Sequence, residues 1–329
     1  MATLSSRCQI LSRLVLRSGR LSAAILKNSI AHFKQLRSLE LSDVVHVKNL
    51  GIWVKVLGTF PSLESLTLST TSDDPAAHLS IAPESSKSRS GGPRYFEALE
   101  DICVTGSFIV IQHVLGFIDS LSLTSIKVYP IFLRNHDYSE GDDDPFTPSM
   151  TIIASKWSLS LKDLVIGRSR VWERIPISKC LMLLTDFHEM ETFHLIGWKM
   201  EEDDDVIRLL KSWPKLRTLN LNQTIVYLST LRTIAENCPE LRYLEIQLDI
   251  YSESDIPPFD TSTVRLNHDL ETLILGGVIT ELQPTLELII EVTRHLDLIF
   301  PDLLTIDVKD DDFSDIGSLV MLCKQVRLL

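Results

Sequence analysis

The segment Leu216-Arg217-Thr218-Leu219-Asn220-Leu221 carries apolar residues at its first, fourth and sixth positions. Close copies of this spacing begin at Leu36, Leu63, Leu241 and Leu270. Looser copies share the same three apolar positions and begin at Leu11, Leu99, Leu123, Leu161, Met190 and Leu303. Alternation of apolar and polar residues over the last four positions predicts a β-strand with one buried face. The chain therefore contains about eleven related segments.

A second feature lies at a fixed distance from these segments. A Cys, Phe or Trp stands three residues before most of the starts, at Cys8, Phe33, Phe60, Phe96, Phe187, Trp213, Cys238 and Phe300, with Ser120, Ser158 and Asn267 as exceptions. Proline often follows it, as at Pro61 and Pro214, where a helix must end before the next strand. The starts lie 24 to 38 residues apart. This combination indicates leucine-rich repeats with insertions.

Between the strands, the apolar spacing changes to three and four residues. Three stripes of this kind are Leu50, Trp53, Val54 and Leu57; Val206, Leu209, Leu210 and Trp213; and Leu288, Val292, Leu296 and Ile299. Such stripes are typical of amphipathic helices. A strand and a helix in each repeat predict an α/β leucine-rich-repeat solenoid, or horseshoe, with parallel strands on the concave face and helices on the convex face.

We expect residues 1–329 to form a single leucine-rich-repeat domain of about eleven irregular repeats, with loop insertions near 70–94, 130–150 and 250–265. Insertions in a solenoid either mark a binding face or reflect loop growth at little cost in free energy, and we favour loop growth. Residues 323–329 match the start of another repeat, at which the chain stops. We therefore expect a truncated C-terminal end.

Composition narrows the function. A net charge of −12 argues against general nucleic-acid binding, which needs clustered Lys and Arg. The sequence contains no run of 18 apolar residues, so it does not predict a membrane span. Five cysteines without a C-x-x-C motif indicate a reducing, intracellular compartment, cytoplasmic or nuclear. Residues 1–39 contain no Asp or Glu, which is also typical of a mitochondrial transit peptide, but Leu11, Leu14 and Leu16 fit the repeat register better.

No motif predicts catalysis, a cofactor or a metal. Asp142–Asp144 and the acidic residues between Asp307 and Asp315 lack the glycine and glutamate of a calcium-binding EF-hand loop. His188 and His194 are six residues apart, whereas a zinc protease helix needs histidines four apart. Nucleotide-binding glycine loops and nucleophile elbows are also missing from the sequence. The sequence therefore predicts a protein that is not an enzyme.

The strand residues between the leucines form the predicted partner-binding surface. The residues most suited to contact a partner are Tyr129, His194, Asn220, Asn222, Tyr243, Glu245 and Gln247. Aromatic side chains supply contact area, and amide and carboxylate groups fix orientation. We expect Leu219 and Leu244 to be buried and Asn220 and Glu245 to face solvent. The alternative is that these residues were selected only for β-propensity.

The chain resembles the leucine-rich-repeat region of fungal F-box proteins, especially those of mushroom-forming fungi. The segments that carry this resemblance are Phe60–Leu68, Trp213–Leu221 and Cys238–Ile246. The resemblance implies a substrate receptor of a ubiquitin ligase, in which an N-terminal F-box docks on the adaptor of a cullin ligase and the repeats hold the substrate. The chain departs from the family because it has no recognisable F-box, so the sequence does not predict that docking. The asparagine usual after each strand is also replaced, by Thr71, Thr224, Val278 and Asp311.

Two hypotheses of function follow. The first is a protein–protein interaction scaffold, which the resemblance extends to the substrate receptor of an F-box-type ubiquitin ligase. The alternative is a repeat fragment of another leucine-rich-repeat protein, such as an immune-type receptor or a GTPase regulator. Both predict a protein partner, which the sequence does not identify, and neither predicts a nucleic acid or a membrane as the partner.

Overall fold

The computed structural model describes residues 10–17, 33, 35–43, 50–70, 95–131, 146–167, 177–200, 203–249, 265–266, 268–279, 286–309, 316–318 and 320. The chain divides into two compact units, unit 1 (Met1–Arg170) and unit 2 (Val171–Leu329). We describe each unit by itself.

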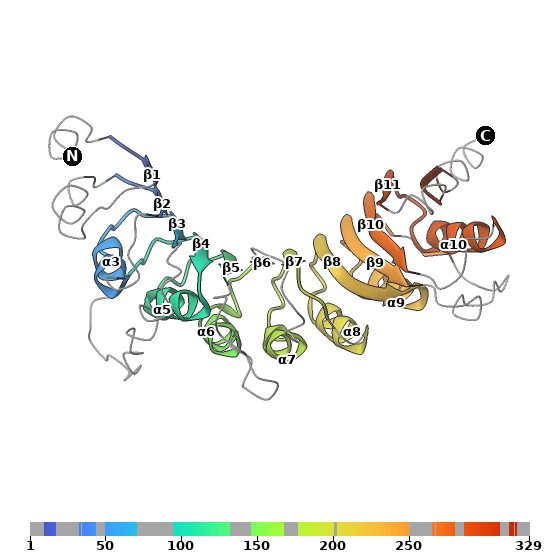
Figure 1. The fold of residues 1–329 in the computed structure, drawn as a ribbon, viewed down its shortest axis with the longest axis horizontal. Helices are drawn as coiled ribbons and strands as arrows, with labels where there is room; N and C mark the ends of the chain where they lie inside the picture. Colours follow the sequence, from blue (N-terminus) through green and yellow to red (C-terminus); the bar gives the residue numbers. More distant parts are fainter. Residues whose placement is uncertain are drawn as a thin grey trace. The chain divides into compact units, whose positions relative to one another are not determined.

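Unit 1 is a parallel sheet with helices along one side of it (Figure 1). Its strands follow the chain order, each paired with the next: β1 (Arg13–Arg17), β2 (Ser38–Ser42), β3 (Ser65–Ser69), β4 (Asp101–Gly106), β5 (Ser125–Pro130) and β6 (Asp163–Gly167). The described helices are α3 (Leu50–Leu57), α5 (Phe108–Phe117) and α6 (Thr147–Trp157).

Unit 2 repeats this arrangement (Figure 1). Its strands are β7 (Thr192–Ile196), β8 (Thr218–Tyr227), β9 (Tyr243–Asp249), β10 (Thr272–Ile279) and β11 (Thr305–Val308), again parallel and paired in chain order. Its helical segments are α7 (Ser178–Leu181), the 3-10 turn η2 (Met182–Leu184), α8 (Asp203–Ser212), α9 (Leu228–Asn237) and α10 (Leu286–Ile299).

The predicted repeat register is confirmed. Every strand begins two residues after the first apolar residue of its repeat; β8, for example, begins at Thr218, after Leu216. The strands pair at equivalent positions, so that Leu219 lies beside Leu244 and Leu244 beside Leu273. Parallel strands joined by helices on one side confirm the α/β leucine-rich-repeat solenoid.

The core of each unit lies between the strands and the helices. Leu219 and Leu244 are fully buried, as predicted, and so are Leu36 and Leu63 in unit 1. The predicted helix stripes are buried along α3, α8 and α10. The aromatic and Cys positions before the strands are buried wherever the structure describes them, at Phe33, Phe60, Phe96, Phe187, Trp213, Cys238 and Phe300. Burial of each large apolar side chain contributes about 1.5–3 kcal/mol to the stability of the folded state. The apolar positions of the sequence pattern therefore form the core.

Main-chain hydrogen bonds link neighbouring repeats at the start of each strand. In unit 2, the N–H groups of Arg242 and Tyr243 donate to the carbonyl oxygen of Arg217, at 2.9 and 3.1 Å. The same pair of bonds occurs at every step between neighbouring repeats inside each unit. Thr224, which stands at an asparagine position, accepts a hydrogen bond from the N–H of Met200 at 3.2 Å. The ladder between repeats is therefore made chiefly by the backbone.

Some expectations fall outside the described residues. They concern most of the insertions near 70–94, 130–150 and 250–265, the Asp142–Asp144 group, and residues 323–329. Among the helices that the structure does describe, none is both long and apolar enough to cross a membrane.

Candidate partner-binding surface

The predicted contact residues lie on the strands. Tyr129 is on β5 of unit 1. The other six lie on three neighbouring strands of unit 2: His194 on β7, Asn220 and Asn222 on β8, and Tyr243, Glu245 and Gln247 on β9. The parallel register places His194 beside Asn220 and Asn220 beside Glu245. The fold therefore brings six of the seven residues onto one surface.

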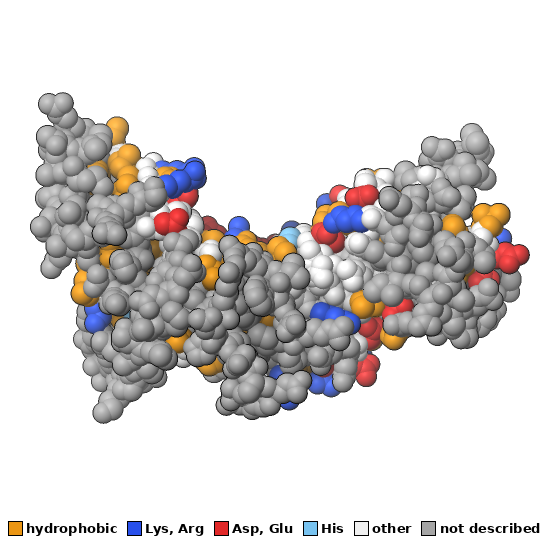
Figure 2. All heavy atoms as spheres, in the orientation of Figure 1, with side chains coloured by type: hydrophobic (Ala, Val, Ile, Leu, Met, Phe, Trp, Pro, Cys, Tyr) orange, Lys and Arg blue, Asp and Glu red, His pale blue; other side chains and the backbone are white. Residues whose placement is uncertain are grey.

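The carboxylate of Glu245 organises the centre of this surface. Its Oε2 accepts hydrogen bonds from Nδ2 of Asn220 at 2.7 Å and from the hydroxyl of Tyr243 at 2.9 Å. Its Oε1 pairs with Nζ of Lys309 at 2.8 Å. We call these four residues the Glu245 cluster. Figure 2 shows acidic and basic side chains next to each other on this part of unit 2.

The expectation that Asn220 and Glu245 face solvent is wrong. Asn220 is 9% exposed and Glu245 is 7% exposed. Both stand on the predicted face of their strands, but each is covered by the polar neighbours that it binds. A buried carboxylate is costly unless it is paired and hydrogen-bonded. The three donors around Glu245 meet that requirement.

The strand β8 contains an irregularity directly after Asn220. The pairing of β8 with β9 shifts between Asn220 and Ile225, so β8 contains extra residues at this point. The carbonyl oxygen of Asn222 lies near β10, where a Cβ atom on Gly276 would be 3.5 Å from it, an ordinary van der Waals contact. The approach of β8 to β10 therefore does not require glycine at this position.

The polar side chains of β8 are held in place by the backbone around them. Oδ1 of Asn222 accepts a hydrogen bond from the N–H of Gly197 at 3.2 Å, and the N–H of Asn222 donates to Oδ1 of Asn220 at 3.1 Å. Gly197 has a positive φ of 78°, a conformation that glycine adopts without strain. The amide groups of β8 are therefore held in a fixed orientation.

Tyr243 remains a hydrogen-bond donor at neutral pH. Burial raises the pKa of the Tyr243 phenol to about 12, and the hydrogen bond to the Glu245 carboxylate and its negative charge act in the same direction. The hydroxyl therefore keeps its proton, and the ring stays half-buried beside Glu245.

Tyr129 has separate surroundings in unit 1. Its ring lies over Gly167 of β6, where a Cβ atom would collide with it. Burial raises the pKa of Tyr129, with a smaller contribution in the same direction from Cys103 of β4. Tyr129 is half-buried and therefore offers only part of its ring for contact.

One residue of the surface was not among the predicted contacts. Lys309 completes the Glu245 cluster. The available signal was its place in the repeat, because Gln247 and Lys309 both stand six residues after the first apolar residue. That position identifies a shared row on the strand face, but it does not indicate that a lysine side chain crosses to another strand.

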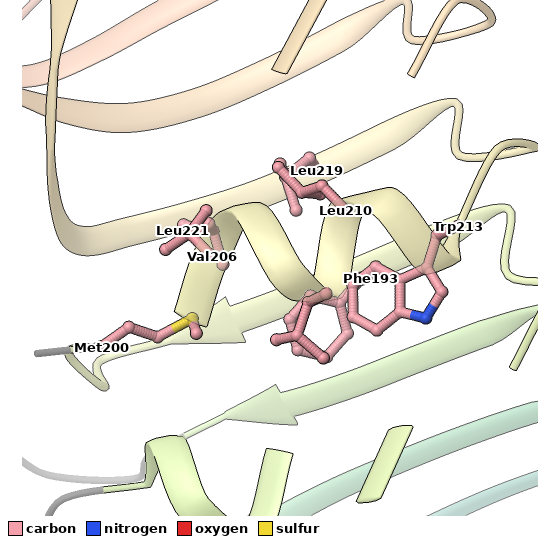
Figure 3. Close-up of a pocket in the computed structure, with 8 residues that line it drawn as sticks. Phe193, Met200, Val206, Leu210, Trp213, Leu219 and Leu221 are labelled. Carbon is pink, nitrogen blue, oxygen red and sulfur yellow. The ribbon is translucent and has the colours of Figure 1, made fainter. Parts of the chain in front are cut away.

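A small gap in the core of unit 2 does not provide a binding site. It has a volume of about 10 Å³ and lies among side chains of α8, β7 and β8, including Phe193, Leu210 and Trp213 (Figure 3). All the lining side chains are apolar, and the indole N–H of Trp213 donates to the carbonyl oxygen of Leu184 at 3.1 Å. An apolar gap of this size holds at most about one water molecule.

Within the described part of the chain, no group of three or more His, Cys, Asp or Glu residues could hold a metal ion. The described cysteines Cys103, Cys180 and Cys238 are free thiols. The polar chemistry of the strand face thus consists of amide, phenol, carboxylate and ammonium groups, which suit recognition by hydrogen bonds and charge.

Comparison with known proteins concerns the fold alone. No protein-family model and no curated protein sequence matches the chain. An internalin (inlF) from Listeria monocytogenes matches with a TM-score of 0.47 and 15% identity, over 94% of this chain and 76% of that one. The leucine-rich repeat-containing protein LegL7 from Legionella pneumophila matches with a TM-score of 0.40 and 13% identity, over 96% and 91%.

A third match, in the TLR13-ssRNA13 complex, has a TM-score of 0.45 and 14% identity, over 92% of this chain and 41% of that one. These similarities are too low to carry an argument about function. The assignment of the repeat fold rests on the strands, helices and register described above.

Proposed function

We propose that the chain is a protein–protein interaction scaffold that contacts its partner through the strand face of unit 2. The supporting observation is the fixed arrangement of Asn220, Tyr243 and Glu245, which are held together by hydrogen bonds of 2.7 and 2.9 Å. Side chains that are already ordered lose little conformational entropy on binding. The half-exposed His194, Asn222, Tyr243 and Gln247 supply groups around this centre that a partner can reach.

We further propose that the partner is a substrate of a ubiquitin ligase and that unit 2 is part of its receptor. This proposal is supported by the resemblance of Phe60–Leu68, Trp213–Leu221 and Cys238–Ile246 to F-box repeat segments. The alternative is a repeat fragment of an immune-type receptor or a GTPase regulator. The genomic sequence upstream of Met1 distinguishes them, because an F-box reading frame there supports the ligase receptor and a nucleotide-binding module supports the alternative. We place the protein in the cytoplasm or nucleus, where its free thiols stay reduced.

Site-specific photocrosslinking tests the contact surface. A photoreactive amino acid is placed at His194 on β7, at Tyr129 on β5, or at Lys211, which is exposed on the helix α8. We expect a crosslinked partner from His194 but not from Lys211, and we expect Tyr243→Ala to reduce it. Lys211 is the matched control because it belongs to the same unit but to a helix.

Two crosslinking results would contradict contact through the strand face of unit 2. A partner that crosslinks from Lys211 and not from His194 places the contact on the helices. A partner that is captured equally with and without Tyr243→Ala, and lost when residues 72–92 are deleted, places it on the first insertion. The crosslink at Tyr129 decides whether unit 1 also takes part.

A further inference from the structure

We propose that Glu245 is a receptor for a lysine or arginine side chain of the protein partner, and that Lys309 occupies this position in the unbound chain. This inference rests on the proposed function, because it names the chemistry that the partner brings to the strand face of unit 2. Lys309 is then an exchangeable occupant that a basic side chain replaces.

The two oxygens of the Glu245 carboxylate have different partners. Oε2 is bound by Asn220 at 2.7 Å and by the hydroxyl of Tyr243 at 2.9 Å, both from neighbouring positions on β8 and β9. Oε1 is bound by Lys309 at 2.8 Å. The orientation of the carboxylate is therefore set by neutral donors within the sheet. When Lys309 leaves, Oε1 still points to the same place.

Exchange of Lys309 requires a lysine that solvent can reach and a carboxylate that is shielded from it. The Glu245 side chain is 9% exposed, whereas the Lys309 side chain is 49% exposed. Lys309 follows β11, and its N–H donates to the carbonyl oxygen of Leu275 on β10 at 2.9 Å. Its main chain is thus tied to the sheet, while its ammonium group sits at the end of a flexible, half-exposed side chain. The ammonium group can turn to solvent without any loss of main-chain pairing.

The site requires a cation as its occupant. A buried carboxylate without a cationic partner is strongly unfavourable. A second acidic residue, Asp307 of β11, pairs with Ile274 of β10, which in turn pairs with Glu245. Ile274 is therefore flanked by two acidic positions on the strand face. The net charge of −12 also attracts basic partners over a longer range.

Other ion pairs of unit 2 do not share these properties. Glu189 with Lys215, Glu240 with Arg217, and Glu271 with Arg242 link neighbouring repeats, but their carboxylate side chains are 42%, 50% and 49% exposed. Water solvates such carboxylates, and exposed pairs contribute little. Among the described ion pairs of this unit, Glu245 is thus the acidic side chain most shielded from solvent.

The proposal is tested with a blocked arginine, N-acetyl-arginine methylamide, as the probe and the Ile274 methyl NMR signal as the readout. The wild type, Lys309→Ala, and Glu245→Gln in both backgrounds are titrated. N-acetyl-glutamine methylamide is the neutral control probe. Lys215→Ala is the matched control variant, because it removes an exposed ion pair of similar length in the same unit.

We expect the arginine probe to shift the Ile274 signal in Lys309→Ala and, at higher concentrations, in the wild type, because Lys309 must first be displaced from a buried carboxylate. Both Glu245→Gln proteins should give no shift, and the neutral probe should give none in any protein. Lys215→Ala should behave as the wild type does.

Two results overturn the proposal. If the wild type shows no shift even at concentrations far above those that saturate Lys309→Ala, Lys309 is a permanent structural contact. If Glu245→Gln leaves binding unchanged, the cation site is elsewhere. Lys309→Gln replaces Lys309→Ala if the alanine variant fails to fold. The titration needs no partner, so a negative result here is distinct from the absence of a crosslink at His194, which counts against the proposed function itself.

Discussion

The ring of Tyr129 on β5 lies over Gly167 on β6, which is buried. Any side chain at residue 167 would occupy the space of the ring, because its Cβ atom would meet the ring carbons directly. The lack of a side chain at Gly167 therefore allows the ring of Tyr129 to pack against the neighbouring strand.

Gly167→Ala should lower the pKa of Tyr129 toward its ordinary value. Burial is the main reason that this pKa is raised, and the alanine methyl group pushes the ring toward solvent. The measurement is an NMR titration of the tyrosine Cζ signals, assigned with Tyr129→Phe. Gly116→Ala is the control, because a Cβ atom there meets no atom within 4 Å. An unchanged titration of Tyr129 in Gly167→Ala would contradict the described position of the ring.

Leu244→Ala should lower the free energy of unfolding by about 2–5 kcal/mol, as truncation of a buried leucine does. Leu244 is fully buried and pairs with Leu219 and Leu273 in the neighbouring strands. Denaturant unfolding followed by circular dichroism measures the loss. Lys211→Ala, on the exposed side of α8, should change the same quantity by about 0.5 kcal/mol or less. Equal effects of the two substitutions would show that the repeat register is wrong.

His268 should make the stability of unit 2 sensitive to mild acid. The N–H of Leu270 donates to Nδ1 of His268 at 3.1 Å, so Nε2 carries the proton and donates to the carbonyl oxygen of Cys238 at 2.9 Å. Burial lowers the pKa of His268, against smaller opposing contributions from the Cys238 carbonyl and Asp269. The folded state therefore takes up a proton less readily than the unfolded state.

The dependence of stability on pH follows from the difference in proton binding to His268 between the folded and unfolded states. Above the unfolded pKa of about 6.5, His268 is neutral in both states and its stabilising contribution is complete. As the pH falls below that value toward the lowered folded pKa, the unfolded state binds more protons and stability declines. Denaturant midpoints at pH 7.5 and 5.5 measure this decline, and His268→Asn should reduce it. A decline of the same size in His268→Asn would assign it to other groups.

Lys156→Met should destabilise the end of α5. Nζ of Lys156 donates to the carbonyl oxygens of Leu115, Gly116 and Ile118, at 3.3, 2.9 and 2.7 Å. These carbonyls lie at the C-terminus of the helix, where a cation is favourable. Since the Lys156 side chain is partly exposed, we expect a loss of about 1–2 kcal/mol. The readout is faster hydrogen exchange in α5, and Lys199→Met, at an exposed position, is the control. Unchanged hydrogen exchange in α5 would show that Lys156 does not stabilise the end of this helix.

The sequence predicted the repeats well because their signal is local. The spacing of Leu216, Leu219 and Leu221 is enough to place β8, and the residue three before Leu216 is enough to place the buried Trp213. The Glu245 cluster was not predictable in this way. Its closure depends on Lys309, which lies 64 residues from Glu245. A contact over this distance leaves no mark in the six-residue pattern.

The main-chain ladder between repeats bears on how such a chain changes in evolution. The carbonyl that accepts both bonds belongs to Arg217 at one step, to Thr124 at another and to Glu64 at a third. Since the link uses no side-chain atom, any residue but proline suits the position that both accepts and donates. A repeat that is duplicated or lost through recombination therefore meets its new neighbour with the same main-chain bonds available, whichever side chains stand at the junction.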